Sequence, residues 1–226
     1  MNLKDIGITI NQIIRYGYGG FLFFLLCAIV HPEASKSVRE SLGDVLCVVI
    51  GFSIGSAIYI ANRPVLGDLV FWNLFEMIHR WRQSRSVREI DSIERGFTCK
   101  RNLLERRYNV RRKDAENAYR LLRDKCYPED MRGRFFAQHT EIHVLYVSFT
   151  VLFGFFLHLL YCHIFYNRAD WSYTIAFLVL SALSVTFAMV EDIRVCEMEC
   201  AHLLTLDDDE IRQMVQRAEF INYDKS

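Results

Sequence analysis

The chain has 226 residues, of which 52% are hydrophobic and 14% are aromatic, and its 27 Lys and Arg balance its 27 Asp and Glu. This balance excludes a strongly basic nucleic-acid binder. The aromatic content excludes an intrinsically disordered chain, because such a chain has too few large apolar groups to bury. The average suggests an ordinary soluble domain, but the apolar and charged residues are segregated into separate long blocks.

Four apolar blocks carry most of the hydrophobic residues: 18–30, 45–61, 144–166 and 171–190. A helix needs about 20 apolar residues to cross the hydrocarbon core of a bilayer. The third and fourth blocks meet this length, the second nearly meets it, and the first meets it together with the apolar residues just before it. The sequence therefore predicts an all-α, polytopic membrane protein with four transmembrane helices and a helical cytoplasmic domain.

Basic residues are concentrated in one connection. Residues 76–141 contain 17 Lys or Arg, whereas the first-to-second and third-to-fourth connections contain two and one. Because Lys and Arg are retained on the cytoplasmic side, we expect a multi-pass protein of the inner (plasma) membrane with both termini in the cytoplasm.

Four regions follow from this orientation. They are an N-terminal helix with transmembrane helices 1 and 2 (1–62), a basic helical cytoplasmic loop (63–138), transmembrane helices 3 and 4 (139–190), and an acidic helical cytoplasmic tail (191–226). Residues 76–141 carry a net charge of +6 and residues 191–226 one of −6. We therefore expect the tail to dock on the loop.

Local signals add detail to the cytoplasmic part. Arg63-Pro64 predicts a bend after the second span, followed by two or three helices. Tyr127-Pro128 predicts a turn, with the third span beginning around Arg134. In the tail, Thr205 or Asp207 is expected to cap one last helix.

Gly51 and Gly55 form a small-xxx-small pattern in the second span. Because glycine has no side chain, a neighbouring helix can approach closely there, so that dispersion contacts hold the pair together in lipid. The pattern predicts tight helix packing, and leaves open whether the partner belongs to this chain or to another subunit.

Arg134 and His139 have the Arg-x4-His spacing of HEPN ribonucleases, in which Arg holds the scissile phosphate and His transfers protons. Phe135 stands where those motifs carry a polar residue. His139 and His143, together with Glu199 and His202, are alternatively candidate ligands for zinc or a di-iron pair. Only one Glu-x-x-His motif is present, however, so we expect no bound metal and no cofactor.

His158 and Cys162 lie one turn apart inside the third span. An ionisable group at membrane depth is costly, and is by default a functional hypothesis. The alternatives are a neutral histidine that is hydrogen-bonded to another helix, and a pore-lining or proton-sensing group.

The densest basic run consists of Arg106, Arg107, Arg111, Arg112 and Lys113. It predicts binding of phosphates, either on anionic lipid or on a nucleotide or RNA. The expected partners are membrane lipid, further copies of the chain, and a cytoplasmic protein, nucleotide or RNA that acts as a trigger. No DNA partner is expected.

The first span opens with 15–20 (RYGYGG) and the second closes with 58–64 (IYIANRP), and a long cytoplasmic helical loop separates the two pairs of spans. This order of parts resembles small four-span membrane proteins of bacterial defence loci, of the CRISPR-accessory or abortive-infection type. The resemblance implies an antiviral effector that forms oligomers and compromises the membrane once a cytoplasmic sensor responds.

The leading functional hypothesis is thus a non-enzymatic, oligomeric pore or membrane-perturbing effector, which is switched through its cytoplasmic domain. One alternative is an enzyme, either a HEPN-like RNase or a metal-dependent membrane enzyme. Another is a membrane scaffold that recruits a soluble partner.

Overall fold

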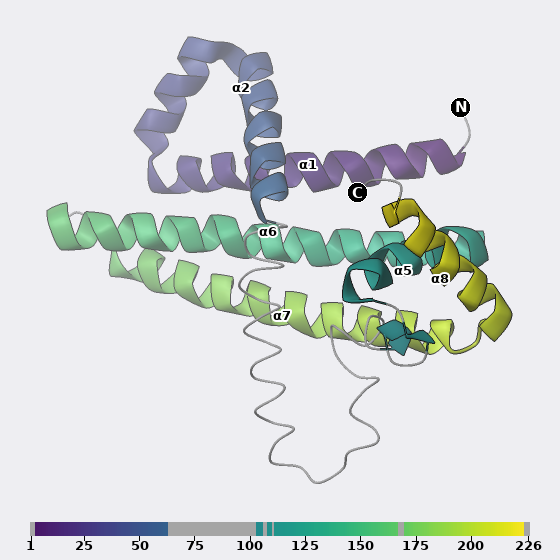
Figure 1. The fold of residues 1–226 in the computed structure, drawn as a ribbon. Coiled ribbons are helices and arrows are strands. Elements are labelled where there is room, and N and C mark those ends of the chain that lie inside the picture. The colour runs from purple at the N-terminus through teal and green to yellow at the C-terminus, as the bar shows by residue number, and fades with distance from the viewer. Residues whose placement is uncertain (1–2, 63–102, 106–107, 110, 167–169, 224–226) are drawn as a thin grey trace, which may run out of the picture. The chain divides into compact units, whose positions relative to one another are not determined.

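The computed structural model describes residues 3–62, 103–105, 108–109, 111–166 and 170–223 (Figure 1). The helices are α1 (Leu3–Val30), α2 (Pro32–Asn62), α5 (Arg112–Cys126), α6 (Glu129–Tyr166), α7 (Trp171–Leu203) and α8 (Asp208–Tyr223). The described part of the chain contains no strand. Helices α1, α2, α6 and α7 are each long and apolar enough to cross a membrane. The prediction of an all-helical chain with four candidate spans is confirmed.

The chain divides into two compact units. Unit 1 comprises Met1–Leu74 and Thr140–Met189, and unit 2 comprises Phe75–His139 and Val190–Ser226. Unit 1 therefore contains α1, α2 and the apolar parts of α6 and α7. Unit 2 contains α5, the start of α6, the end of α7, and α8, so the loop and the tail fall in the same unit. The predicted bend at Arg63-Pro64 and the first loop helices lie outside the described residues.

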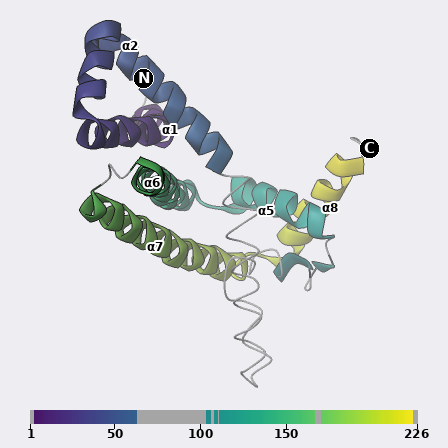
Figure 2. The ribbon, with the colours of Figure 1, turned by 90° about the vertical axis from the view of Figure 1, so that its left-hand side faces the viewer.

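In unit 1, α1 and α2 touch through their backbones where they cross (Figures 1 and 2). A Cβ atom added at Gly20 would fall on the carbonyl group of Gly51. One added at Gly55 would collide with the Tyr16 carbonyl oxygen and lie 2.7 Å from the Gly20 nitrogen. The glycines of the second span therefore pack within the chain, against a glycine-rich turn of α1.

Helix α2 bends sharply at Gly43, where φ is 74° and ψ is 161°. Glycine adopts positive φ without steric cost. The Arg39 guanidinium spans the bend, with Nε donating to one carboxylate oxygen of Asp44 at 2.6 Å and a terminal nitrogen donating to the other at 3.3 Å. The bend separates a charged first segment from the apolar part of α2, which matches the predicted span 45–61.

Helix α1 runs parallel to α6, as a series of side-chain hydrogen bonds indicates. Arg15 Nε donates to Thr140 Oγ1 at 2.9 Å, and Tyr18 Oη and Ser148 Oγ are 2.9 Å apart. Ser148 already donates its hydroxyl proton to the Val144 carbonyl, so Tyr18 is the donor. These bonds pair polar side chains of α1 with polar side chains of α6.

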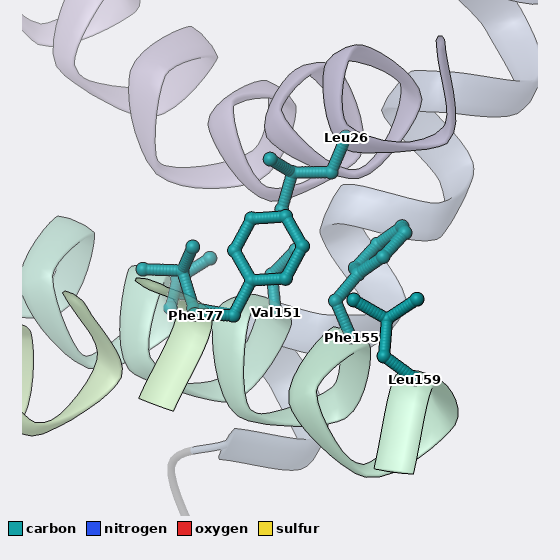
Figure 3. Close-up of a cluster of buried hydrophobic side chains, with 7 residues drawn as sticks. Leu26, Val151, Phe155, Leu159 and Phe177 are labelled. Carbon is teal, nitrogen blue, oxygen red and sulfur yellow. The ribbon is translucent and has the colours of Figure 1, made fainter. Parts of the chain in front are cut away.

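An apolar cluster lies farther along the same pair of helices (Figure 3). Leu26 of α1 packs there with residues of α6 and with Phe177 of α7. The α6 members of the cluster are Val147, Val151, Leu152, Phe155 and Leu159. Three helices thus share one core.

In unit 2, α8 packs on α5 and buries Ile211 and Val215. The Asp207 carboxylate accepts a hydrogen bond from the Asp209 backbone nitrogen at 2.9 Å, so the predicted cap by Asp207 is confirmed. Tyr108 donates to the Asp208 carboxylate at 2.6 Å.

The helix that contains the third span begins before the predicted span. Helix α6 begins at Glu129, directly after the predicted turn at Tyr127-Pro128, and the start of the span itself around Arg134 stays a prediction. Its first turn contains Glu129 and Asp130, whose charges stabilise a helix N-terminus. The polar residues there belong to the helix itself, so apolar content alone does not locate the helix start.

We predict that Gly20→Ala weakens the packing of α1 on α2. The new methyl group meets backbone rather than a movable side chain, which costs about 1–3 kcal/mol or more. Unfolding of the purified protein in mixed micelles of increasing SDS content measures this loss. Gly154→Ala in α6 is the matched control, because a Cβ there meets nothing within 4 Å. Equal stability of the two variants would contradict the crossing geometry.

Candidate functional site

Glu199 of α7 is fully buried in unit 2. One of its carboxylate oxygens, Oε1, lies 3.1 Å from Nε2 of His139 on α6. An ionised carboxylate only accepts hydrogen bonds, so His139 Nε2 is the donor in the ionised form of Glu199. Glu199 reaches this position because Val195, Cys196, Cys200 and Leu203 bury the same face of α7. A buried carboxylate is tolerated only where a hydrogen-bond partner such as His139 compensates for its lost hydration.

Two tyrosines surround the pair. Tyr127 donates its hydroxyl proton to the Glu199 backbone carbonyl at 3.2 Å, and Tyr119 of α5 is 5% exposed. Burial raises the pKa of both phenols, and the negative charge of Glu199 raises it further. Both phenols therefore stay protonated beside the carboxylate.

His202 is also part of this group of side chains. Its contacts indicate which ring nitrogen carries the proton when the ring is neutral. Its ring meets Tyr127 edge-to-face, with centroids 4.4 Å apart. The Thr205 hydroxyl donates to the His202 backbone carbonyl at 2.7 Å, so Nδ1 of His202 donates to that hydroxyl oxygen at 3.3 Å. In the neutral ring Nε2 then carries the lone pair, and it is buried with no hydrogen-bond partner among the described residues. We call Tyr119, Tyr127, His139, Glu199 and His202 the Glu199 cluster.

The HEPN-like residues are not brought together. Arg134 is exposed, whereas His139 is half-buried against Glu199. Both residues are on α6, and residues five apart on a helix with 3.6 residues per turn point in directions about 140° apart. Within one chain, Arg134 and His139 therefore do not contact the same phosphate group.

The candidate metal ligands are also distributed over different contacts. His139 meets Glu199, but the His143 ring packs on Tyr59 of α2, with centroids 5.4 Å apart, and His202 packs on Tyr127. Within the described ranges, no group of three or more His, Cys, Asp or Glu side chains is placed to hold a metal ion.

His158 and Cys162 do form a cluster, together with a residue that sequence reasoning missed. His158 Nε2 lies 2.9 Å from Nε2 of His31, and 3.8 Å from the Cys162 sulfur. The available signal for His31 was its position directly after the first apolar block, next to Pro32. Only the parallel packing of α1 and α6 places it beside His158.

The basic run is described only in part. Arg111 is exposed and precedes α5. Arg112 and Lys113 begin α5, but their side chains lie outside the described residues, as do Arg106 and Arg107 altogether. The predicted phosphate binding stays a prediction.

Comparisons with known proteins give no family for the chain: no family model, no curated protein and no solved structure matches it. The functional argument therefore depends on the residues themselves.

We predict that His139→Leu destabilises the protein, because it leaves a buried carboxylate without its partner, at a cost of about 1–3 kcal/mol. The double variant His139→Leu/Glu199→Met should recover most of this loss, since apolar pairs of similar volume replace buried ionic pairs well. The SDS-unfolding free energies of a double-mutant cycle measure the coupling. Arg134→Ala, exposed on the same helix, should change stability by less than about 0.5 kcal/mol. Additive effects of the two cluster substitutions would refute the coupling.

A second prediction concerns alkaline stability. Because burial and Glu199 raise the phenol pKa values of Tyr119 and Tyr127, the folded state favours the protonated phenols. Their contribution to stability is complete below the pKa of an unfolded tyrosine, about 10, and is lost as the pH rises above it. Tyr119→Phe should therefore move alkaline unfolding, followed by circular dichroism and phenolate absorbance, to higher pH. Tyr161→Phe, a change at an exposed residue of α6, should not, and identical curves for Tyr119→Phe and the native protein would contradict the assignment.

Proposed function

We propose that the protein is a regulated, oligomeric membrane effector, either a pore or a membrane-perturbing protein, which is switched through unit 2. The Glu199 cluster is the observation that carries this proposal. It joins side chains of α5, α6 and α7 around one fully buried carboxylate. Helices α6 and α7 are also two of the four candidate spans.

The cluster suits a switch because a buried carboxylate is stable only in one arrangement of its partners. Removing one partner leaves an uncompensated charge and favours a different packing of the helices. Helix α6 has 38 residues and α7 has 33, and each contributes to both units. A change in helix packing at the cluster would therefore act on the same helices that form the spans.

The spans support a membrane role for two reasons. Several of their polar side chains are paired between helices, as Tyr18 is with Ser148. Large apolar side chains cover their outer faces, among them Phe21, Val48, Ile175 and Phe187. Such faces suit lipid or a second copy of the chain.

The proposed location is the inner membrane, with unit 2 and both termini in the cytoplasm, where a protein, nucleotide or RNA acts as the trigger. The resemblance to four-span proteins of defence loci makes antiphage defence the proposed setting. The proposed mechanism requires no cofactor.

We expect Glu199→Ala to imitate the triggered state. Full-length protein in vesicles that contain zwitterionic and anionic lipids is assayed for release of an entrapped dye. Native protein should release little dye, and Glu199→Ala should release it rapidly. Adding Gly55→Leu, which disrupts the crossing of α1 and α2, should suppress the release.

Two outcomes of this experiment count against the effector. One is vesicles that stay as tight with Glu199→Ala as with native protein. The other is release that persists in the double variant, as nonspecific damage by misfolded protein would produce. RNA cleavage by native protein that Arg134→Ala abolishes would replace the proposal with the ribonuclease.

A further inference from the structure

Two histidines from α1 and α6 meet at one end of unit 1. His31 directly follows the last residue of α1, and His158 lies in the second half of α6. Their Nε2 atoms are 2.9 Å apart, and their rings meet edge-to-face at 73°. A nitrogen–nitrogen contact of this length requires a proton on one Nε2 and a lone pair on the other.

We propose that His31 and His158 form an acid-operated latch between α1 and α6. The latch is closed while the pair carries one proton between the two Nε2 atoms, whether the pair is neutral or singly charged. A single charge strengthens the bond, because an imidazolium donor is a better donor than a neutral ring. The latch opens when both rings are charged. Each Nε2 then carries a proton, neither can accept, and two positive charges face each other at close range.

The response of the latch to acid depends on the two histidines rather than on the other titratable groups near them. Cys27 lies one turn before His31, and Cys162 one turn after His158, with its sulfur 3.8 Å from His158 Nε2. The titratable and charged groups nearest in sequence are Tyr161 and His163 on α6, Glu33 and Lys36 on α2, and Asp170 and Tyr173 around the start of α7. From 171 to 190, α7 carries no Asp, Glu, Lys, Arg or His. No carboxylate forms a hydrogen bond with either ring in the described part of the chain.

Opening would be local. The apolar cluster of Leu26, Phe155 and Phe177 continues to hold α1, α6 and α7 together beside the latch. His31 and His158 are both exposed and lie outside the buried core of unit 1. Histidine changes its charge between about pH 5 and pH 8. Because the charge on one ring opposes charging of the other, the latch opens only below this range, where it separates the end of α1 from α6. This conclusion holds whether or not the protein is a membrane effector.

The direct test is the distance between spin labels at Ile29→Cys and Ile164→Cys, in a chain whose native cysteines have been replaced, reconstituted in lipid nanodiscs. Pulsed electron resonance is recorded at about pH 7.5 and at about pH 4, which lies below the range in which a single histidine gains its charge, because the pair resists its second proton. We expect a longer distance at the lower pH. His158→Gln should abolish the shift, since a glutamine still bonds to His31 but takes no charge. His163→Gln, the matched control, should retain it.

A second measurement keeps the native cysteines. In protein labelled with ¹⁵N-histidine, a scalar coupling between two Nε2 nuclei across the hydrogen bond should be present at about pH 7.5, be absent at about pH 4, and be missing in His31→Gln. Equal label distances at both pH values, or a shift that survives in His158→Gln, would overturn the latch. So would a coupling that persists in acid.

Discussion

The contact between Gly20 and Gly51 is the constraint on which unit 1 depends. No Cβ fits between these backbones, so α2 crosses α1 in one register only. Helix α1 then presents its remaining faces to α6, where Arg15 and Tyr18 find polar partners and Leu26 enters the apolar core. In a lipid environment, where apolar side chains gain little by leaving the solvent, close packing and internal hydrogen bonds supply the specificity. Helix α1 thus links α2 to α6 within unit 1.

Much of this architecture could be read from the sequence. The apolar blocks located the four candidate spans, because length and the absence of charge suffice for that purpose. Gly51 and Gly55 were recognised as a packing site, but their partner was not, since small-residue spacing gives one side of a contact. The bend at Gly43 was missed, because it depends on backbone geometry rather than on hydropathy.

What the sequence alone predicts about the candidate sites is limited in a similar way. His139, His202 and Glu199 were selected from their spacing as metal ligands, yet the folded chain uses them in a mostly buried polar cluster with two tyrosines. Spacing along a helix identifies residues that share a face, but not what the opposite helix brings to them. Tyr119 was outside any motif, and His31 paired with His158 across 127 positions of sequence. Long-range pairs of this kind follow from tertiary packing alone.

The Glu199 cluster and the spans together support one account, in which four helices cross the membrane and unit 2 lies on the cytoplasmic side. Its most direct test is the accessibility of single cysteines, at Ser41→Cys in the charged segment of α2 and at Arg212→Cys in α8, to a membrane-impermeant maleimide. The account predicts that residue 41 is labelled in intact cells and that residue 212 is labelled only after the cells are permeabilised. Labelling of residue 212 in intact cells would contradict it.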